Sequence, residues 1–413
     1  AKLDYIQSCG FNVIWLNPIN KSSFRDAGYD VTDFYAVDPR YGTNDDYKSL
    51  CNEVHKRGMK IIFDLVAGHT SDKHPWFKES SKAERNQYSD YYIWTVGKNY
   101  KKPGPKFVNN NYPRDGYYIR NFFECQPALN YGYYSPKPNH HWEQGYDAPG
   151  PTAVRAELKK IIAHWCDMGA DGFRVDMAQS LVKSDTKNRD GVRRLWNEIF
   201  EWYNSAYPEN IMLSEWSNPE QSLSAGFNID LLIHNGIGGK VYRPLVCETT
   251  DKMVPTVCYF NREGKGEIRA AMELYGEIYN TYRRLGGYAS MPTNSHDIWR
   301  LTRMNRATAE EQKAAWEAFY GLHKAGKVKA AWAVEHGLAE GIMKMSFGND
   351  IGFKSNPETA LQYGPAYGQI IAELTEEIEG AELIGWTTAE PVISYGNETV
   401  SIDELYQLNT AVL

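Results

Sequence analysis

The chain has 413 residues, of which 42% are hydrophobic and 23% are charged, an ordinary composition for a globular protein with one large barrel or two to three smaller domains. The net charge of −7 argues against a nucleic-acid-binding protein, because no basic stripe is present to neutralise phosphates. No apolar run is long enough to cross a bilayer, so we expect no membrane partner.

Short apolar runs of strand length alternate along the chain with patterns typical of helices. The strand-like runs are Phe11–Leu16, Met59–Val66, Ala170–Asp176, Ile211–Glu215, Phe227–Ile233 and Tyr288–Pro292, with Gly341–Phe347 as a weaker candidate. The helical patterns include Asp45–Arg57, Thr152–Met168, Val192–Tyr203, Glu267–Leu285 and Ala307–Ala325. This alternation predicts a parallel sheet, and the number of units favours an α/β fold of the (β/α)8 TIM-barrel type over a doubly wound sheet.

The domain organisation departs from a simple barrel. Residue 1 falls inside a helix-like segment before Phe11–Leu16, so the barrel is predicted to lack its first strand. Residues 67–150 are rich in Tyr, Trp, Asn, Pro and Gly, which predicts an irregular inserted domain after the third strand. We therefore expect a catalytic barrel over residues 1–66 and 151–380, and a tail over 381–413 that is too short for a β-sandwich. Either the barrel is open, or a tail segment such as Ala381–Trp386 fills the gap.

The six cysteines form no CxxC pair, so a zinc site is not expected. Reduced thiols in a cytoplasmic protein are the simpler interpretation, although Cys247 and Cys258 could pair in a secreted one. No signal peptide is visible, which favours a cytoplasmic location. Since no initiator Met is present, the true N-terminus could lie upstream.

Three acidic residues stand where predicted strands end. Asp176 and Glu215 each close a strand-like run, and Asp297 follows Tyr288–Pro292. All three would lie on the carboxyl face of the barrel, which carries the active site in this architecture. His69 and His296 also follow predicted strands, so they are expected on the same face.

Arg174 and Asp176 are two residues apart, so on a strand both side chains point the same way. The guanidinium would keep the carboxylate ionised, as a nucleophile requires; a structural ion pair is the alternative. Glu215 follows an apolar strand and precedes Trp216, a setting that can raise a carboxyl pKa. Glycoside hydrolysis uses such a pair, and a retaining mechanism predicts that the two carboxyl groups lie about 5–5.5 Å apart.

Taken in order, these segments resemble the α-amylase family, glycoside hydrolase family 13. The segments similar to the four regions of that family are Asp64–Ser71, Gly172–Asp176, Leu213–Trp216 and Asn294–Asp297. Phe11–Pro18 and Ala27–Asp30 resemble the second barrel strand and its loop, and Gln126–Asn130 resembles the QPDLN segment of the oligo-1,6-glucosidase and trehalose-synthase branch. The resemblance covers roughly residues 1–300.

The resemblance implies a role for each matching residue. Asp176 would be the nucleophile, Glu215 the general acid/base and Asp297 the stabiliser of the transition state. Asp64 would be structural. The substrate-binding residues would be Tyr29, Asp30, His69, Arg174 and His296, and Arg300, four residues past His296, could reach the pocket.

Departures from the family pattern concern calcium. Gly68 stands where the family usually has an Asn that often helps to bind calcium, and Met177–Ser180 replaces the Ala-x-Lys-His that supplies a calcium-binding His in the amylase branch. We therefore expect no required cofactor or metal, and no calcium at the usual position.

The expected function is a retaining glycoside hydrolase that cleaves α-glucosidic bonds of oligosaccharides. One alternative is a transglycosidase or isomerase such as a trehalose synthase. The other is a non-catalytic sugar-binding or interaction protein on a degenerate barrel. The sequence leaves open the choice between α-1,4 and α-1,6 bonds, the preferred chain length and the oligomeric state.

Overall fold

The computed structural model describes residues 2–97, 104–109, 111–233, 236–241, 269–290, 292, 296–297, 309–333, 337–347, 349–359 and 370–411. The chain divides into two compact units, Ala1–Arg306 and Ala307–Leu413. Each unit has its own sheets and its own hydrophobic core.

The first unit is built on a parallel sheet. Its described strands, in spatial order, are β1 (Val13–Leu16), β4 (Lys60–Leu65), β7 (Gly172–Val175), β8 (Ile211–Ser214), β9 (Ile229–Leu231) and β10 (Tyr288–Ser290). Every neighbouring pair is parallel, so the sheet is that of a partial (β/α)8 barrel. Among the described residues β1 and β10 are its edge strands. The predicted fold class is confirmed, with strand ends shifted by a few residues.

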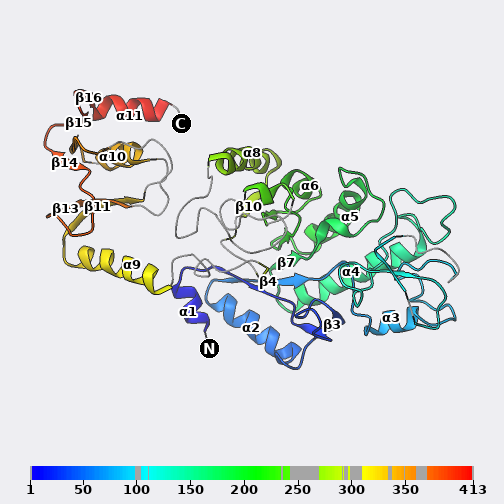
Figure 1. Ribbon diagram of the computed structural model, residues 1–413. Coiled ribbons are helices and arrows are strands. Elements are labelled where there is room, and N and C mark those ends of the chain that lie inside the picture. The colour runs from blue at the N-terminus through cyan, green and yellow to red at the C-terminus, as the bar shows by residue number, and fades with distance from the viewer. Residues whose placement is uncertain are drawn as a thin grey trace. The chain divides into compact units, whose positions relative to one another are not determined.

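Helices connect these strands and lie along the outside of the sheet (Figure 1). They are α2 (Asn44–Lys56), α4 (Pro149–Asp167), α5 (Asp190–Ala206), α6 (Pro219–Ser224) and α8 (Arg269–Leu285), and α1 (Leu3–Ser8) precedes β1. Local sequence sets their starts. Thr43 forms a capping box with Asp46 before α2, and Pro149 opens α4, where its missing N–H costs no hydrogen bond.

Aromatic side chains dominate the core between the sheet and its helices. The rings of Phe63 on β4 and Trp165 on α4 stack with centroids 4.4 Å apart. Both residues are almost fully buried, as is Phe173 on β7. Burying each such side chain contributes about 1.5–3 kcal/mol, so this contact fixes α4 against the strands that carry the candidate site.

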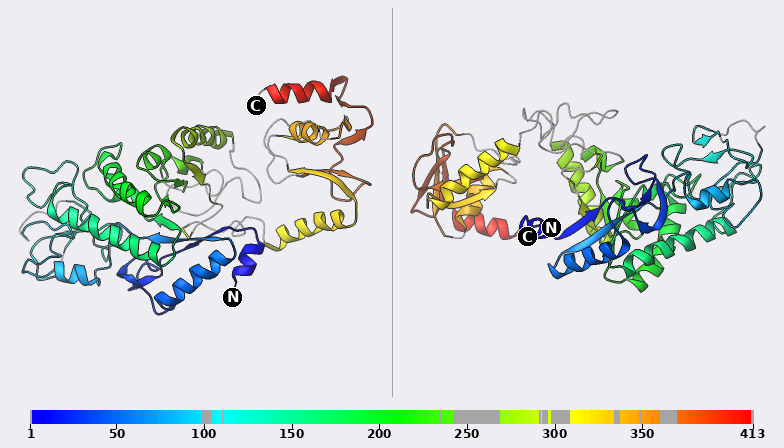
Figure 2. Two further views of the ribbon diagram at one scale, coloured as in Figure 1. Left: turned by 180° about the vertical axis from the view of Figure 1, so that it is seen from behind. Right: turned by 90° about the horizontal axis from the view of Figure 1, so that it is seen from below.

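Two segments interrupt the strand–helix alternation. After β1, an antiparallel pair is formed by β2 (Asn20–Ser22) and β3 (Val31–Val37). Between β4 and α4 lie α3 (Pro75–Ser80), β5 (Phe107–Val108) and β6 (Tyr118–Ile119). This second segment, which falls in the predicted inserted domain, gathers at one end of the first unit (Figure 2). Its own small apolar cluster consists of Ile93, Ile119, Ala128, Tyr133 and Trp142.

The second unit combines antiparallel and mixed pairing. Its elements are α9 (Ala309–Lys324), β11 (Val328–Ala333), α10 (Leu338–Ser346), β12 (Gly352–Ser355), β13 (Ile370–Leu374), β14 (Gly385–Thr388), β15 (Val392–Tyr395), β16 (Glu398–Ser401) and α11 (Ile402–Ala411). Strand β11 pairs with β13, and a separate sheet has the order β14-β12-β15-β16. Ile342, Phe353 and Ile371 form the buried core.

The second unit corrects three sequence-based predictions. The barrel limit at residue 380 is wrong, because the strands from β11 onward pair among themselves in the second unit. The proposal that Ala381–Trp386 fills a gap in the barrel is also wrong, since β14 pairs with β12. Gly341–Phe347 is not a strand but part of α10. Leu338, Ile342 and Met345 recur at helical spacing on the face that meets the core.

Two further findings concern the helices and the cysteines. None of the helices in the described parts of the chain is long and apolar enough to cross a membrane. Cys9, Cys51, Cys125 and Cys166 are free thiols, whereas Cys247 and Cys258 lie outside the described residues.

Candidate active site

The sheet register brings four charged residues to one edge of the first unit. Asp64 on β4 is the register partner of Arg174 on β7. Asp176 and Glu215 directly follow β7 and β8, and their backbone N–H groups donate to Leu65 O and Val175 O, each at 3.0 Å. The ladder thus continues one residue past each strand. The positions of both carboxylates are therefore set by rigid sheet backbone.

Arg174 ties the three carboxylates together. Its Nη1 donates to Asp64 Oδ1 at 2.9 Å and to Asp176 Oδ1 at 3.0 Å, and its Nη2 lies 2.8 Å from Glu215 Oε1. The Arg174 and Asp64 side chains are 1% and 0% exposed, whereas those of Asp176 and Glu215 are 10% and 12% exposed. The two residues predicted to react are therefore the ones that an incoming molecule can reach.

The charges of this cluster do not balance, since three carboxylates surround one guanidinium. Burial raises the pKa of Asp176 well above its usual value, and Glu215 and Asp64 raise it further, while Arg174 opposes them. Burial by itself would lower the pKa of Arg174, but the three carboxylates raise it well above its usual value. The ion pair alone would favour the ionised form of Asp176. Desolvation acts on Asp176 in the opposite direction and is the larger effect.

A strained turn holds Glu215 from the other side. Met177 has φ +45° and ψ +41°, a left-handed conformation that is costly for a residue with a side chain. In this conformation its backbone N–H donates to Glu215 Oε2 at 2.9 Å. One Glu215 oxygen thus faces Arg174 and the other faces Met177.

An aromatic wall covers Asp64. Tyr29 Oη donates to Asp64 Oδ2 at 2.8 Å and Trp15 Nε1 donates to the same oxygen at 3.2 Å. The ring of His296 stacks on Tyr29 with centroids 5.6 Å apart and meets Trp15 edge-on at 5.9 Å. His296 Nε2 also lies 3.1 Å from Tyr29 Oη. Residues from four separate segments of the chain thus converge on one wall.

His69 is buried beneath this wall. Its Nε2 lies 3.0 Å from Tyr29 O and its Nδ1 lies 3.0 Å from Asn121 Nδ2. Because a carbonyl oxygen only accepts, Nε2 carries the ring proton and Nδ1 accepts. Burial lowers the pKa of His69 to about 4, so the ring is neutral at pH 7. Both ring nitrogens are engaged by protein groups, so His69 supports Tyr29 in this structure rather than offering a nitrogen to a sugar.

The remaining predicted site residues are Asp30, Asp297 and Arg300. Asp30 is fully buried and accepts hydrogen bonds from Ser22 Oγ and from the Asp26 N–H, at 2.9 and 3.1 Å, which organises its own loop. Asp297 has a side chain that is 41% exposed, with Oδ2 3.5 Å from His296 Nε2. Arg300 lies outside the described residues.

The position expected for calcium in relatives is closed by an amide. A Cβ on Gly68 would come within 2.7 Å of Asn121 Nδ2, so Asn121 occupies the space that a side chain at position 68 would fill. No group of three or more His, Cys, Asp or Glu side chains suited to a metal occurs among the described residues.

Sequence reasoning did not identify two of these contacts. Trp15 lies on β1, and its indole N–H donates to Asp64. Its position near the end of a predicted strand could have indicated a place at the site. Asn121 lies in the irregular segment, 52 residues from His69. No local pattern indicates that contact.

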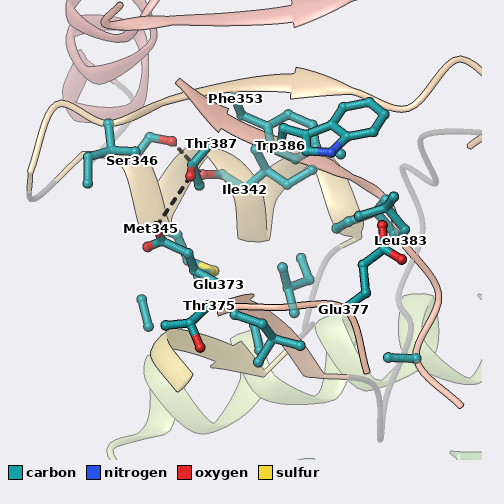
Figure 3. A pocket seen from close by; sticks show the side chains of 18 of the residues that line it. Ile342, Met345, Ser346, Phe353, Glu373, Thr375, Glu377, Leu383, Trp386 and Thr387 are labelled. Carbon is teal, nitrogen blue, oxygen red and sulfur yellow. Dashed lines mark hydrogen bonds between the residues drawn. The ribbon is translucent and has the colours of Figure 1, made fainter. Parts of the chain in front are cut away.

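A hollow of about 470 Å³ lies within the second unit. Its apolar lining includes Ile342, Met345 and Phe353, and its polar lining includes Glu377 and Glu382. Figure 3 shows Met345 and Ser346 on one side of the hollow and Glu377 and Leu383 on the opposite side. None of the described residues that line it is an arginine. The hollow therefore lacks a guanidinium between two carboxylates, and we take the Arg174 cluster as the candidate active site.

Comparison with known proteins gives the geometry a family context. The model of the alpha-amylase family, described as the alpha amylase catalytic domain, matches residues 1–230. An oligo-1,6-glucosidase of Parageobacillus thermoglucosidasius is 40% identical over 190 residues, which are 44% of this chain and 31% of that protein. A trehalose synthase/amylase of Mycobacterium tuberculosis is 34% identical over 225 residues, covering 52% of this chain and 34% of that protein.

Among solved structures, the trehalose-6-phosphate hydrolase of Bacillus licheniformis is similar, with a TM-score of 0.54 and 25% identity. The match covers 70% of this chain and 51% of that chain. The aligned part of this chain spans about a third of the length of the curated relatives. The residues that the family model matches lie within the first unit.

Proposed function

The chain belongs to the α-amylase family, and we propose that it is a retaining glycoside hydrolase that cleaves α-glucosidic bonds in oligosaccharides. One observation carries the proposal. The single guanidinium of Arg174 contacts both Asp176 and Glu215, and both carboxylates keep a small exposed fraction. Retaining glycosidases need two such carboxyl groups close together, flanking the scissile glycosidic bond.

In the first proposed step, an Asp176 carboxylate oxygen attacks the anomeric carbon and forms a covalent glycosyl ester. The bond from that carbon to the leaving oxygen breaks, and the Glu215 proton passes to the leaving oxygen. In the second step Glu215 takes a proton from water, the water oxygen attacks the anomeric carbon, and Asp176 is released as a carboxylate. A proton from water thus replaces the one that Glu215 gave to the leaving group, and Asp176 is again ionised after one turnover.

Two features of the cluster support this division of roles. Asp176 accepts a hydrogen bond from Nη1 of Arg174, whose positive charge favours the ionised form of the attacking carboxylate. The surplus of carboxylates over guanidinium favours retention of one proton within the cluster. We assign Tyr29, His296, Asp297 and Arg300 to contacts with the bound sugar.

A transglycosidase is the second candidate. It is favoured by the relative named trehalose synthase/amylase, which matches 52% of this chain. The covalent step is the same, but a sugar hydroxyl replaces water in the second step. A non-catalytic sugar-binding role is less favoured, because the Asp176, Glu215 and Arg174 side chains are all present and in contact. None of the proposed steps uses a metal.

The test is incubation of the whole chain with maltose, isomaltose, sucrose and maltotriose, with every product resolved. Hydrolysis predicts glucose, and transfer predicts a rearranged or lengthened sugar. Mass spectrometry with a slow fluorinated glucosyl fluoride should find one added glycosyl group, located on Asp176. Labelling of another residue, or no turnover of any α-glucoside by folded protein, would refute the proposal.

A further inference from the structure

Asp230 lies directly beside the turn that carries Glu215. It sits on β9 as the register partner of Ser214 on β8, and it is fully buried. Its Oδ1 accepts from Ser214 Oγ at 2.9 Å and from the Ser217 backbone N–H at 3.0 Å. One oxygen therefore binds the residue before Glu215 and the turn that follows it.

The turn beyond Glu215 is strained. Ser217 has φ +58°, in the left-handed region that costs a residue with a side chain about 1–2 kcal/mol. Its carbonyl oxygen accepts from Gly238 N at 3.0 Å, and its Oγ donates to Ile233 O at 3.2 Å. These contacts surround the turn, but Asp230 is the group that contacts both flanks of Glu215.

Burying a carboxylate at this position costs free energy, because the charge is removed from water. Burial raises the pKa of Asp230 to about 7, against hydrogen bonds from Ser214 and from the backbone of Ser217, Asn218 and Trp216. Its Oδ2 has no hydrogen-bond partner among the described residues. A well-packed apolar side chain would avoid this desolvation cost. A contribution to stability therefore does not explain Asp230, whereas its contacts with Ser214 and Ser217 indicate a functional role.

We propose that Asp230 is a positioning residue that holds Glu215, through Ser214 and Ser217, in the orientation needed to protonate the leaving oxygen. The inference rests on the proposed function. It concerns the acid step, since Asp176 is held separately by the Leu65 carbonyl and Arg174. Loss of Asp230 should therefore harm protonation much more than nucleophilic attack.

The experiment varies the leaving group. The kcat/KM of retaining hydrolysis reports the steps up to the glycosyl-enzyme, and fluoride leaves without protonation whereas a sugar does not. In Asp230→Ala we expect kcat/KM on maltose or isomaltose to fall roughly 10- to 100-fold, but on α-glucosyl fluoride by less than about threefold. Asp230→Asn keeps the volume and one acceptor, so it should give an intermediate ratio. Ser214→Ala, which removes one of the two contacts, should also lie between.

The matched control is Asp171→Asn, which alters a carboxylate at the opposite end of β7 that also accepts a backbone N–H. It should change both substrates by the same small factor. Equal losses on both substrates in the Asp230 variants, or no loss, would overturn the inference. If Asp230→Ala does not fold, an unchanged ratio in Asp230→Asn and Ser214→Ala overturns it equally. Failure of the unaltered protein on both substrates would instead refute the proposed function.

Discussion

The two ends of β7 carry carboxylates in opposite settings. At the amino end, Asp171 accepts from Lys60 Nζ at 2.8 Å and from the Ile61 N–H at 2.8 Å, and lies 2.7 Å from His55 Nε2. Three donors serve one carboxylate, and Lys60 is largely exposed. At the carboxyl end, Asp176 shares the buried guanidinium of Arg174 with two other carboxylates.

The pKa values follow this difference. Burial alone would raise the pKa of Asp171, but hydrogen bonds from Lys60, Ile61 and His55 lower it. The pKa of Asp176 is raised, because burial and neighbouring carboxylates exceed the effect of Arg174. At the amino end of β7 the donors stabilise the charged form of Asp171, whereas at the carboxyl end burial and neighbouring carboxylates destabilise the charged form of Asp176. Destabilised charge of this kind is typical of a catalytic site.

The largest expected effect comes from Asp176→Asn. Turnover of α-glucosides should fall by roughly 10⁴-fold, because the amide cannot attack the anomeric carbon. The melting temperature should not fall, since the change removes one of three negative charges around Arg174. Steady-state kinetics and thermal unfolding on the same preparation measure both. Activity within tenfold of the unaltered protein would contradict the assignment.

Arg174→Met should unfold more easily, by about 3–5 kcal/mol at pH 7, because three carboxylates, of which Asp64 and Asp176 are buried, lose their counter-charge. Burial already raises the pKa of Asp176 in the folded state, and loss of the opposing guanidinium raises it further above the unfolded value near 4. A raised folded pKa means stability that is present at low pH and lost as pH rises. Urea unfolding should therefore show a deficit at pH 7 that shrinks toward pH 5. A deficit independent of pH would contradict this electrostatic account.

Two buried imidazoles should make the first unit sensitive to acid. Burial lowers the pKa of His69 to about 4 and that of His74 to about 3. Below pH 6.5 the two imidazoles bind protons in the unfolded chain but remain neutral in the folded chain. The free energy of unfolding therefore decreases as pH falls from 6.5 toward 4. The loss is roughly 3 kcal/mol for each ring.

The variant His74→Asn tests this effect without removing the helix cap. His74 Nδ1 accepts from the Trp76 N–H at the start of α3, and Asn is also a good N-cap. The dependence of unfolding free energy on pH should become about one proton shallower between pH 6.5 and 4. An unchanged slope would show that His74 takes up its proton in the folded state.

The smallest expected effect comes from Asp171→Asn at the amino end of β7. Its ion pairs involve partly exposed partners, so the free energy of unfolding should fall by about 1 kcal/mol. Activity should stay within about twofold, because no contact reaches Arg174. A large loss of activity would contradict the claim that the carboxylate at the amino end of β7 has only a structural role.

Much of the site could be predicted from the sequence, because strand ends are local features. Asp176 and Glu215 each follow a short apolar run, and parallel strands place such residues on one face. The direction of the Asp176 pKa could not be predicted. It depends on how deeply the residue is buried and on Asp64, a partner from another strand. The contact of Asn121 with His69 spans 52 residues of irregular chain, and no periodic pattern indicates it.

The sequence by itself determined the strand–helix alternation of the first unit and the residue types that end its strands. Both depend on residues that are close together in the sequence, namely the hydrophobic periodicity and the carboxylates that follow each apolar run. Only the tertiary structure decided that residues 307–413 form a unit of their own. A short apolar run such as Gly341–Phe347 fits a strand or a helix equally well, and packing against Phe353 and Ile371 makes it a helix. Only the tertiary structure, too, placed Asp230 against Ser214 and Ser217, since these contacts depend on the register between β8 and β9.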